Sequence, residues 1–387
     1  MARSVYINNV SVFMPNNAIS NDEMESVLGQ AGERASRARR IVLRNNGIKT
    51  RYYAIDPETG KANYSNAQLA ANAIKKLTEN RIALEEIQCL AASTSMADQV
   101  IPGHAVMVQG ELGNPSTEVV TTSGVCLCGI TALKYAYMTI ALGLHNVAVA
   151  AASETASNIM RGYQFDPELE SKVDDLKNHS ELAFEKDFLR WMLSDGAGSA
   201  LLQAEPNRQG ISLKIEWIDI RSYANEQEVC MYAGGEKIEG KIKGWTQYWP
   251  LEREKQSIMS VKQDVRLLNE KVIHYTVERT LTDILRTRQL TPDEIDYFLP
   301  HYSSEFFRQK VYDGLKNIDF EIPFDKWFTN LTSKGNTGSA SIFIILEELF
   351  HSGRLRKGQN LLCYVPESGR FSSSFLYLKV VERTEDR

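Results

Sequence analysis

Short apolar runs alternate along this chain with segments in which apolar residues recur every three or four positions. The runs CLAAST, EVVTT, NVAVAAASE and NLLCYVPES predict buried strands. After Cys126, an apolar residue recurs at every third or fourth position and predicts a helix with one buried face, formed by Ile130, Leu133, Tyr137, Ile140 and Leu144 and closed by Gly143. Strands that alternate with helices predict an α/β fold with mostly parallel, buried sheets.

The pattern also repeats within the chain. The segment ENRIALEEIQCLAAST resembles TRQLTPDEIDYFLPHY without a gap, so that Ser93 corresponds to His301 at an offset of 208 residues. Further on, TSGVCLCGITAL corresponds to TSKGNTGSASIF, and Cys126 pairs with Asn336 at an offset of 210 residues. Two offsets that agree this closely predict two duplicated, βα-rich halves that face each other, residues 1–205 and 206–387.

Composition narrows the class of protein. The chain is 43% hydrophobic and 24% charged, values that are typical of globular proteins. It has no apolar stretch of about 18 residues and no secretory signal, which predicts neither a membrane span nor export. Five scattered cysteines without zinc-ligand spacing predict a reduced, cytoplasmic protein with no metal or other cofactor. The net charge of −5 argues against nucleic acid as a partner.

Cys126 is the first candidate for chemistry, because it lies where a strand turns into a helix between Gly124 and Gly129. Free N–H groups and the helix dipole are expected to favour a thiolate there. Such a thiolate attacks a thioester carbonyl and holds the acyl group. The simpler interpretation is that Cys126 is a small apolar residue that fills the core.

His301 and Asn336 fall at related places in the second half, His301 at a strand end and Asn336 at a helix start. A neutral imidazole and an amide both donate hydrogen bonds to a thioester oxygen and stabilise the enolate beside it. Together with Cys126 they suit carbon–carbon bond formation between thioesters. Asn336 also fits a simple cap of the following apolar helix. A Cys-His-Asn peptidase uses the same residue types, although nothing in the sequence indicates a peptide cleft.

The order of Cys126, His301 and Asn336 resembles that of the β-ketoacyl-acyl-carrier-protein synthase III family of the thiolase superfamily. The segments NNGIKTRYYA, SDGAGSALL, PH and GNTGSAS are similar to motifs of that family in order and spacing. The resemblance implies a five-layered α-β-α-β-α thiolase-like fold and a homodimer. It also implies that Cys126, His301 and Asn336 are catalytic and that the N–H groups of Cys126 and Gly369 form an oxyanion hole.

Two cysteines compete for the role of nucleophile. The usual family pattern, Cys-x-Gly, favours Cys128, which precedes Gly129. Counting without gaps from Cys126, however, places Ala132, Leu133 and Ala136 where the family has Ala, Leu and Ala. Cys126 also matches Asn336 in the duplication, so we assign the nucleophile to Cys126 and a packing role to Cys128.

Three features depart from the chain-initiating members of the family. Ile41 and Asn45 stand where those members keep a Trp and an Arg that grip coenzyme A, which makes coenzyme A a less expected carrier. The glycine-rich loop near the C-terminus reads PESGRFSSSF and keeps Gly369. The segment 156–192 is long and rich in charged and aromatic residues, as expected either for a solvated helical surface or for part of a tunnel mouth.

These departures resemble the branch that forms dialkylresorcinols, flexirubins and stilbenes. Such enzymes join an α,β-unsaturated acyl group to a β-ketoacyl thioester by Michael addition and Claisen condensation, giving a cyclohexanedione. One alternative is a chain-initiating synthase that uses acyl-coenzyme A and malonyl carrier protein. Another is a non-catalytic partner subunit of a ketosynthase, although such subunits usually lose the nucleophile.

An acyl carrier protein is the partner that the resemblance implies. Carrier proteins are acidic and this chain has a pI near 5.8, so docking requires a local basic patch. The family places that patch on the helix after the catalytic histidine, and Phe306 occupies its usual arginine position. The candidates that remain are Arg308, Lys310 and Lys316, of which Arg308 lies nearest the site; an ordinary solvated charge explains each of them equally well.

Overall fold

The computed structural model describes residues 2–31, 39–165 and 189–383. Its main feature is a nine-stranded sheet. From one edge to the other, the strands are β5 (Glu118–Ser123), β4 (Cys89–Thr94), β6 (Val147–Glu154), β7 (Gly196–Gln203), β1 (Tyr6–Phe13), β8 (Ile211–Ser222), β15 (Ser372–Glu382), β14 (Asn360–Pro366) and β13 (Tyr297–Pro300).

The sheet consists of two similar parts. Strand β1 pairs with β8 only through Tyr6 and Ile7. The first five strands and the last four therefore form two parts that are joined by this short pairing. The first part has the order β5-β4-β6-β7-β1, and the second has the order β13-β14-β15-β8. Beside β13, a single parallel bridge from Phe298 to Trp327 takes the place that β5 has beside β4. This correspondence agrees with the duplication, whereas the division at residues 205 and 206 stays a prediction.

The expectation of mostly parallel sheets is wrong. Strands β4, β5 and β6 pair in parallel, as do β13 and β14. Strands β1, β7, β8 and β15 pair antiparallel with their neighbours. Only the residues 367–371 join β14 to β15, which leaves no room for a crossover helix, and these two strands therefore run in opposite directions.

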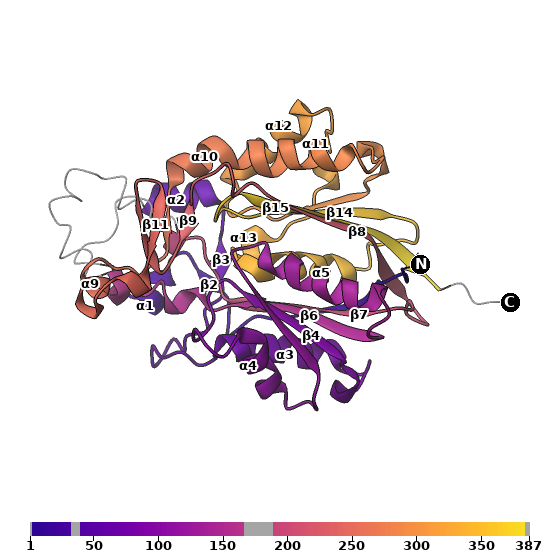
Figure 1. Ribbon diagram of the computed structural model, residues 1–387, viewed down its shortest axis with the longest axis horizontal. Helices are drawn as coiled ribbons and strands as arrows, with labels where there is room; N and C mark the ends of the chain where they lie inside the picture. Colours follow the sequence, from indigo (N-terminus) through magenta and orange to yellow (C-terminus); the bar gives the residue numbers. More distant parts are fainter. Residues whose placement is uncertain (1, 32–38, 166–188, 384–387) are drawn as a thin grey trace.

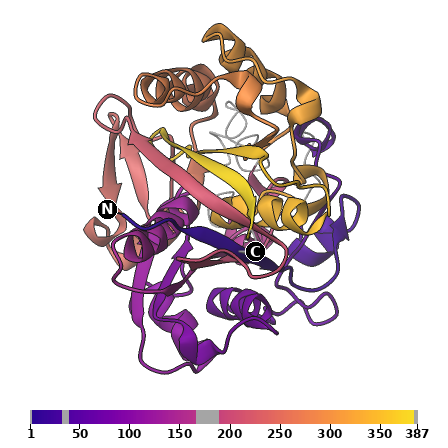
Figure 2. The same cartoon turned by 90° about the vertical axis from the view of Figure 1, so that its right-hand side faces the viewer.

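Helices complete five layers (Figure 1). On one outer face lie α3 (Asn66–Thr78) and α4 (His104–Leu112), and between the sheets lie α5 (Cys128–Ala141) and α14 (Ser341–His351). The opposite outer face carries α10 (Val265–Ile273), a π-helical turn (His274–Arg279), α11 (Thr280–Leu285) and α12 (Phe306–Asn317). Figure 2 shows the same order of layers from the side. The fold is therefore the predicted α-β-α-β-α arrangement.

The remaining elements are short. They are α1 (Met24–Leu28), α2 (Arg39–Asn46), α9 (Pro250–Lys255) and α13 (Leu331–Lys334), with the strand pairs β2 (Ile19–Ser20) and β3 (Thr50–Arg51), β9 (Met231–Tyr232) and β12 (Lys262–Gln263), and β10 (Gly235–Ile238) and β11 (Lys241–Gly244). Most of the charged segment predicted within 156–192 lies outside the described residues.

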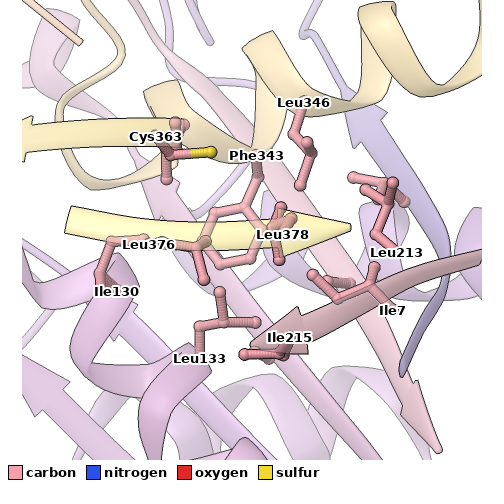
Figure 3. Packing of buried hydrophobic residues seen from close by; sticks show 14 of the residues in the cluster. Ile7, Ile130, Leu133, Leu213, Ile215, Phe343, Leu346, Cys363, Leu376 and Leu378 are labelled. Atoms are coloured by element: carbon pink, nitrogen blue, oxygen red, sulfur yellow. The ribbon is translucent and has the colours of Figure 1, made fainter. Parts of the chain in front are cut away.

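The central helical layer holds the largest core (Figure 3). Ile130 and Leu133 of α5 and Phe343 and Leu346 of α14 pack between the two sheets. Gly129 makes the close approach of these helices possible, because a Cβ there would lie 2.2 Å from the Ser339 carbonyl oxygen. The predicted buried face of α5 is confirmed for Ile130, Leu133 and Ile140, and Tyr137 is half-buried.

The predicted end of that face is wrong. Helix α5 stops at Ala141, and Gly143 follows in a left-handed conformation with φ of 76°. Leu144 therefore lies beyond the last helical turn and is exposed. In the described residues, no helix has the length and apolar character that crossing a membrane requires.

Candidate active site

Cys126 lies in the turn between β5 and α5, at the junction of two cavities. Helix α5 begins at Cys128, so Cys126 precedes the first helical residue by two positions. Only 9% of Cys126 is exposed. It borders a cavity of about 600 Å³ and, on another side, a small one of about 40 Å³. A group attached to its sulfur therefore has space in two directions.

The large cavity is mostly apolar and lies between the ends of the first-half strands and the excursion of residues 223–263. Apolar side chains of its wall are Met96, Ile159, Leu189, Met192, Met231, Trp245, Met259 and Val261. Polar residues also line it, and Asn336 and Glu154 are among them. A volume of this size is within the usual range for small-molecule sites.

His301 lines the small cavity together with Cys126. It follows the last residue of β13, as predicted, and its backbone N–H donates to the Tyr364 carbonyl oxygen at 2.8 Å. The side chain is 3% exposed. Burial lowers the pKa of His301 to about 4, because the charged imidazolium loses its hydration. The imidazole is therefore neutral at pH 7 and has one N–H to donate.

Asn336 approaches Cys126 from the large cavity. Its backbone N–H donates to the Met192 carbonyl oxygen at 3.0 Å, and its carbonyl oxygen accepts the Ser194 N–H at 2.8 Å. The side-chain Oδ1 accepts the Gly338 N–H at 3.0 Å. Through this bond Asn336 holds the start of the turn Gly338–Ala340, which leads into α14, and its Nδ2 amino group remains to donate. The cap and the catalytic interpretation are compatible, because they use different atoms of the amide.

The structure contradicts the expectation that Cys126 is a ready thiolate. Burial raises the pKa of the Cys126 thiol, and the nearby carboxylates of Glu154 and Glu367 raise it further. The cost of desolvating a thiolate exceeds the help from the helix start. The thiol must therefore lose its proton as it attacks.

Gly369, the second predicted oxyanion donor, lies in the turn between β14 and β15. A Cβ at Gly369 would lie 3.2 Å from a side-chain carbon of Val125, so this turn packs against the residue before Cys126. The Glu367 carboxylate accepts the Arg370 N–H at 3.0 Å and also engages the Gly369 N–H. That carboxylate has to turn away before the Gly369 N–H serves a substrate oxygen. The role of Gly369 stays a prediction.

Cys128 is 3% exposed and does not border either of the two cavities. Its position on the first turn of α5 is that of a packing residue. All five cysteines are buried, and none takes part in a disulfide.

Sequence reasoning missed Glu154, the last residue of β6. It is 5% exposed, and it borders the large cavity with Cys126 and Asn336. A charged residue directly after the apolar run VAVAAAS was the available signal, since buried carboxylates are rare.

The predicted docking residues lie on α12, which is helical as expected. The Arg308 guanidinium lies 4.8 Å from the centre of the Phe324 ring and 4.0 Å from a Glu305 oxygen. Lys310 lies over Phe306, at 4.2 Å from the ring centre. Both cations rest on aromatic faces, which hold their stems in place but leave part of each charge in water.

Comparisons with known proteins show what the chain is similar to in sequence. Residues 285–372 match the family described as 3-oxoacyl-[acyl-carrier-protein (ACP)] synthase III C terminal. The chain is 23% identical over 356 residues to a β-ketoacyl-[acyl-carrier-protein] synthase III of Bacillus anthracis, covering 92% of each chain.

Solved structures show the same fold. One is OleA of Xanthomonas campestris with bound lauric acid and lauroyl-CoA, at a TM-score of 0.73 and 19% identity, with 98% of this chain and 100% of that chain covered. Another is AbyA1, a tetronic acid condensing enzyme, at a TM-score of 0.72 and 17% identity, with 97% and 99% covered. The sequence matches confirm the predicted resemblance to β-ketoacyl-acyl-carrier-protein synthase III, whose curated members are acyltransferase-type condensing enzymes, and the solved structures confirm the fold.

Proposed function

We propose that this protein joins two acyl thioesters by carbon–carbon bond formation through an acyl group held on Cys126. The observation that carries the proposal is that Cys126 borders two cavities, one with Asn336 and one with His301. In the first step the Cys126 sulfur attacks a thioester carbonyl, and the thiol proton passes to the carrier thiolate, which leaves as the free thiol. The apolar cavity of about 600 Å³ receives the chain.

In the second step the carbonyl oxygen of another thioester accepts hydrogen bonds from the imidazole N–H of His301 and from Nδ2 of Asn336. These donors stabilise the enolate that forms beside the carbonyl. The enolate forms as the α-carbon loses a proton, or carbon dioxide in the case of a malonyl unit. Its carbon attacks the acyl carbonyl, and the Cys126 thiolate leaves and takes up a proton, which in the first case balances the one lost from the α-carbon. Neutral His301 suits this role, because its buried ring already carries the proton that it donates.

The finer proposal is fusion of an α,β-unsaturated acyl group with a β-ketoacyl thioester to a cyclohexanedione, by Michael addition and Claisen condensation. It is supported by Ile41 and Asn45, which are exposed on α2. Binding of coenzyme A at these positions would need an aromatic ring and a cation, and neither residue supplies one. An acyl carrier protein is then the expected donor, docking at Arg308 with Lys310 and Lys316 as neighbours on α12. The competing function is chain initiation from acyl-coenzyme A and malonyl carrier protein, which the names of the curated relatives favour.

A homodimer is also part of the proposal. Strand β5 forms one edge of the large sheet, and its residues are half-buried or exposed. Val100 and Ile101 lie exposed in the loop that precedes α4, the helix packed on β5. An uncovered edge strand beside apolar side chains suits pairing with a second copy, and sedimentation velocity would measure it.

The central experiment is intact-protein mass spectrometry after incubation with a panel of acyl carrier proteins. Wild type should gain one acyl mass, Cys126→Ala should gain none, and Cys128→Ala should still load. His301→Ala and Asn336→Ala should load but condense about 10²–10³-fold more slowly, the usual loss for an oxyanion donor. Loading that survives Cys126→Ala, or wild-type condensation rates without His301 or Asn336, would refute the proposal.

Product analysis separates the two candidate functions. Chain initiation releases carbon dioxide from malonyl carrier protein, whereas fusion with a β-ketoacyl unit does not require it. An absent acyl adduct with every carrier would instead support a non-catalytic partner subunit.

A further inference from the structure

Glu154 is a buried carboxylate with an unusual set of partners. Its Oε1 accepts four hydrogen bonds: from the Ser95 N–H at 3.0 Å and hydroxyl at 2.7 Å, and from the Ser339 N–H at 3.1 Å and hydroxyl at 2.5 Å. Its Oε2 receives the Thr94 hydroxyl at 3.3 Å. Within the described part of the chain, no cation lies at ion-pair distance from Glu154. Hydrogen bonds alone therefore compensate for its lost hydration.

These partners belong to segments that are far apart in sequence. Ser95 follows β4 of the first half, whereas Ser339 lies in the turn before α14 of the second half, 185 residues after Glu154. Gly338 lies directly over the carboxylate with φ of 54°, and a Cβ there would lie 3.0 Å from Oε1. Glu154 thus joins the strand ends of one half to the Gly338–Ala340 turn of the other.

The same turn fixes the side chain of Asn336. The Gly338 N–H donates to Oδ1 of Asn336 at 3.0 Å and so determines which end of the amide faces the cavity. We infer that Glu154 is a positioning residue, which anchors the Gly338–Ala340 turn through Ser339 so that Nδ2 of Asn336 is presented to the second thioester. This inference rests on the proposed function, because it assigns Glu154 a positioning role in the condensation step.

The choice of variants follows from the hydrogen bonds. Glutamine at position 154 keeps a carbonyl oxygen for the four donors, and its NH₂ group has the Thr94 hydroxyl as acceptor. Alanine leaves the N–H groups of Ser95 and Ser339 without their acceptor, and the turn loses its anchor. Ser339→Ala removes the hydrogen bond from the Ser339 hydroxyl to Glu154 and keeps the one from the Ser339 N–H. Its matched control is Ser11→Ala, which also removes a buried hydroxyl, bonded to Ser199 at 3.0 Å, outside both cavities.

The experiment measures two rates for each variant by mass spectrometry: acylation of Cys126, and decay of the acyl-enzyme when the second thioester is added. Glu154→Ala should acylate at the wild-type rate or faster, because a carboxylate that raises the pKa of the Cys126 thiol is removed. It should condense at least 10-fold more slowly, up to the ~10²–10³-fold loss for a missing oxyanion donor. Ser339→Ala should show the same split to a smaller extent. Glu154→Gln should recover most of the condensation rate, and Ser11→Ala should keep the wild-type ratio of the two rates.

Equal loss of both rates in Glu154→Ala, or condensation at the wild-type rate, would overturn the inference. A crystal structure of Glu154→Ala tests it without any turnover: the contact between the Gly338 N–H and Oδ1 of Asn336 should be broken or the amide turned. Retention of that contact at 3.0 Å would refute the positioning role. A wild-type protein that never forms the acyl-enzyme would refute the proposed function instead, and the crystal structure would still decide the role of Glu154.

Discussion

Protonation of His301 is the perturbation whose size follows most directly from the structure. Burial lowers the pKa of His301 from its ordinary 6.5 to about 4. This lowering of the pKa corresponds to about 3 kcal/mol of preference for the neutral ring. Because the ring is 3% exposed, solvent screening reduces this figure little. We therefore expect His301 to stay neutral throughout the pH range in which the enzyme would work.

The sign of the stability effect follows from the direction of the shift. Between pH 6.5 and 4 the unfolded chain binds a proton at His301 and the folded chain does not, so the free energy of unfolding falls as the pH falls. The contribution is fully present above pH 6.5, and about 2 kcal/mol of it should be lost by pH 5. His301→Gln cannot titrate, so its free energy of unfolding should fall by about 2 kcal/mol less than that of wild type between pH 7 and 5.

Two measurements check this reasoning. Urea denaturation of wild type and His301→Gln at both pH values gives the difference in stability loss, in which the other buried histidine, His104, cancels. Long-range ¹H–¹⁵N spectra of the imidazoles give the pKa of His301 directly, with the variant as the assignment control. A measured pKa of 6 or above, or equal pH dependence in the two proteins, would refute the neutral-donor role.

Three further predictions concern the surroundings of the site. Alkylation of Cys126 by iodoacetamide should keep rising above pH 9, because burial and the carboxylates of Glu154 and Glu367 raise its pKa; a plateau below pH 8 in the mass-spectrometric rates would contradict this. Gly129→Ala should destabilise the protein by at least ~1–3 kcal/mol in thermal or urea unfolding, because its Cβ would lie 2.2 Å from the Ser339 carbonyl oxygen; unchanged stability would mean that α5 and α14 move apart freely. Arg308→Glu should weaken turnover of carrier-bound substrate and spare a small thioester mimic, as added salt should do for wild type; equal loss on both substrates would indicate damage to the site instead.

Local patterns in the sequence determined much of the fold. The three- and four-residue spacing after Cys126 predicted α5. The matching offsets predicted that His301 lies at the end of a strand and Asn336 at the start of a helical segment. Such features depend on neighbours in the chain, so periodicity and duplication reveal them. Motifs with the same order and spacing as those of the β-ketoacyl-acyl-carrier-protein synthase III family then indicated the resemblance to that family.

Tertiary structure alone decided the electrostatics of the site. The sequence pattern placed Cys126 at a helix start and favoured a thiolate, whereas burial and two carboxylates, from β6 and from the β14–β15 turn, raise its pKa. The direction of β7 and β15 and the exposure of Leu144 likewise depended on contacts beyond the local repeat. Glu154 meets Ser339 across 185 residues, a contact that no local spacing encodes. The cost of burying a charge is set by what surrounds it in space, and that becomes known only when distant segments are brought together.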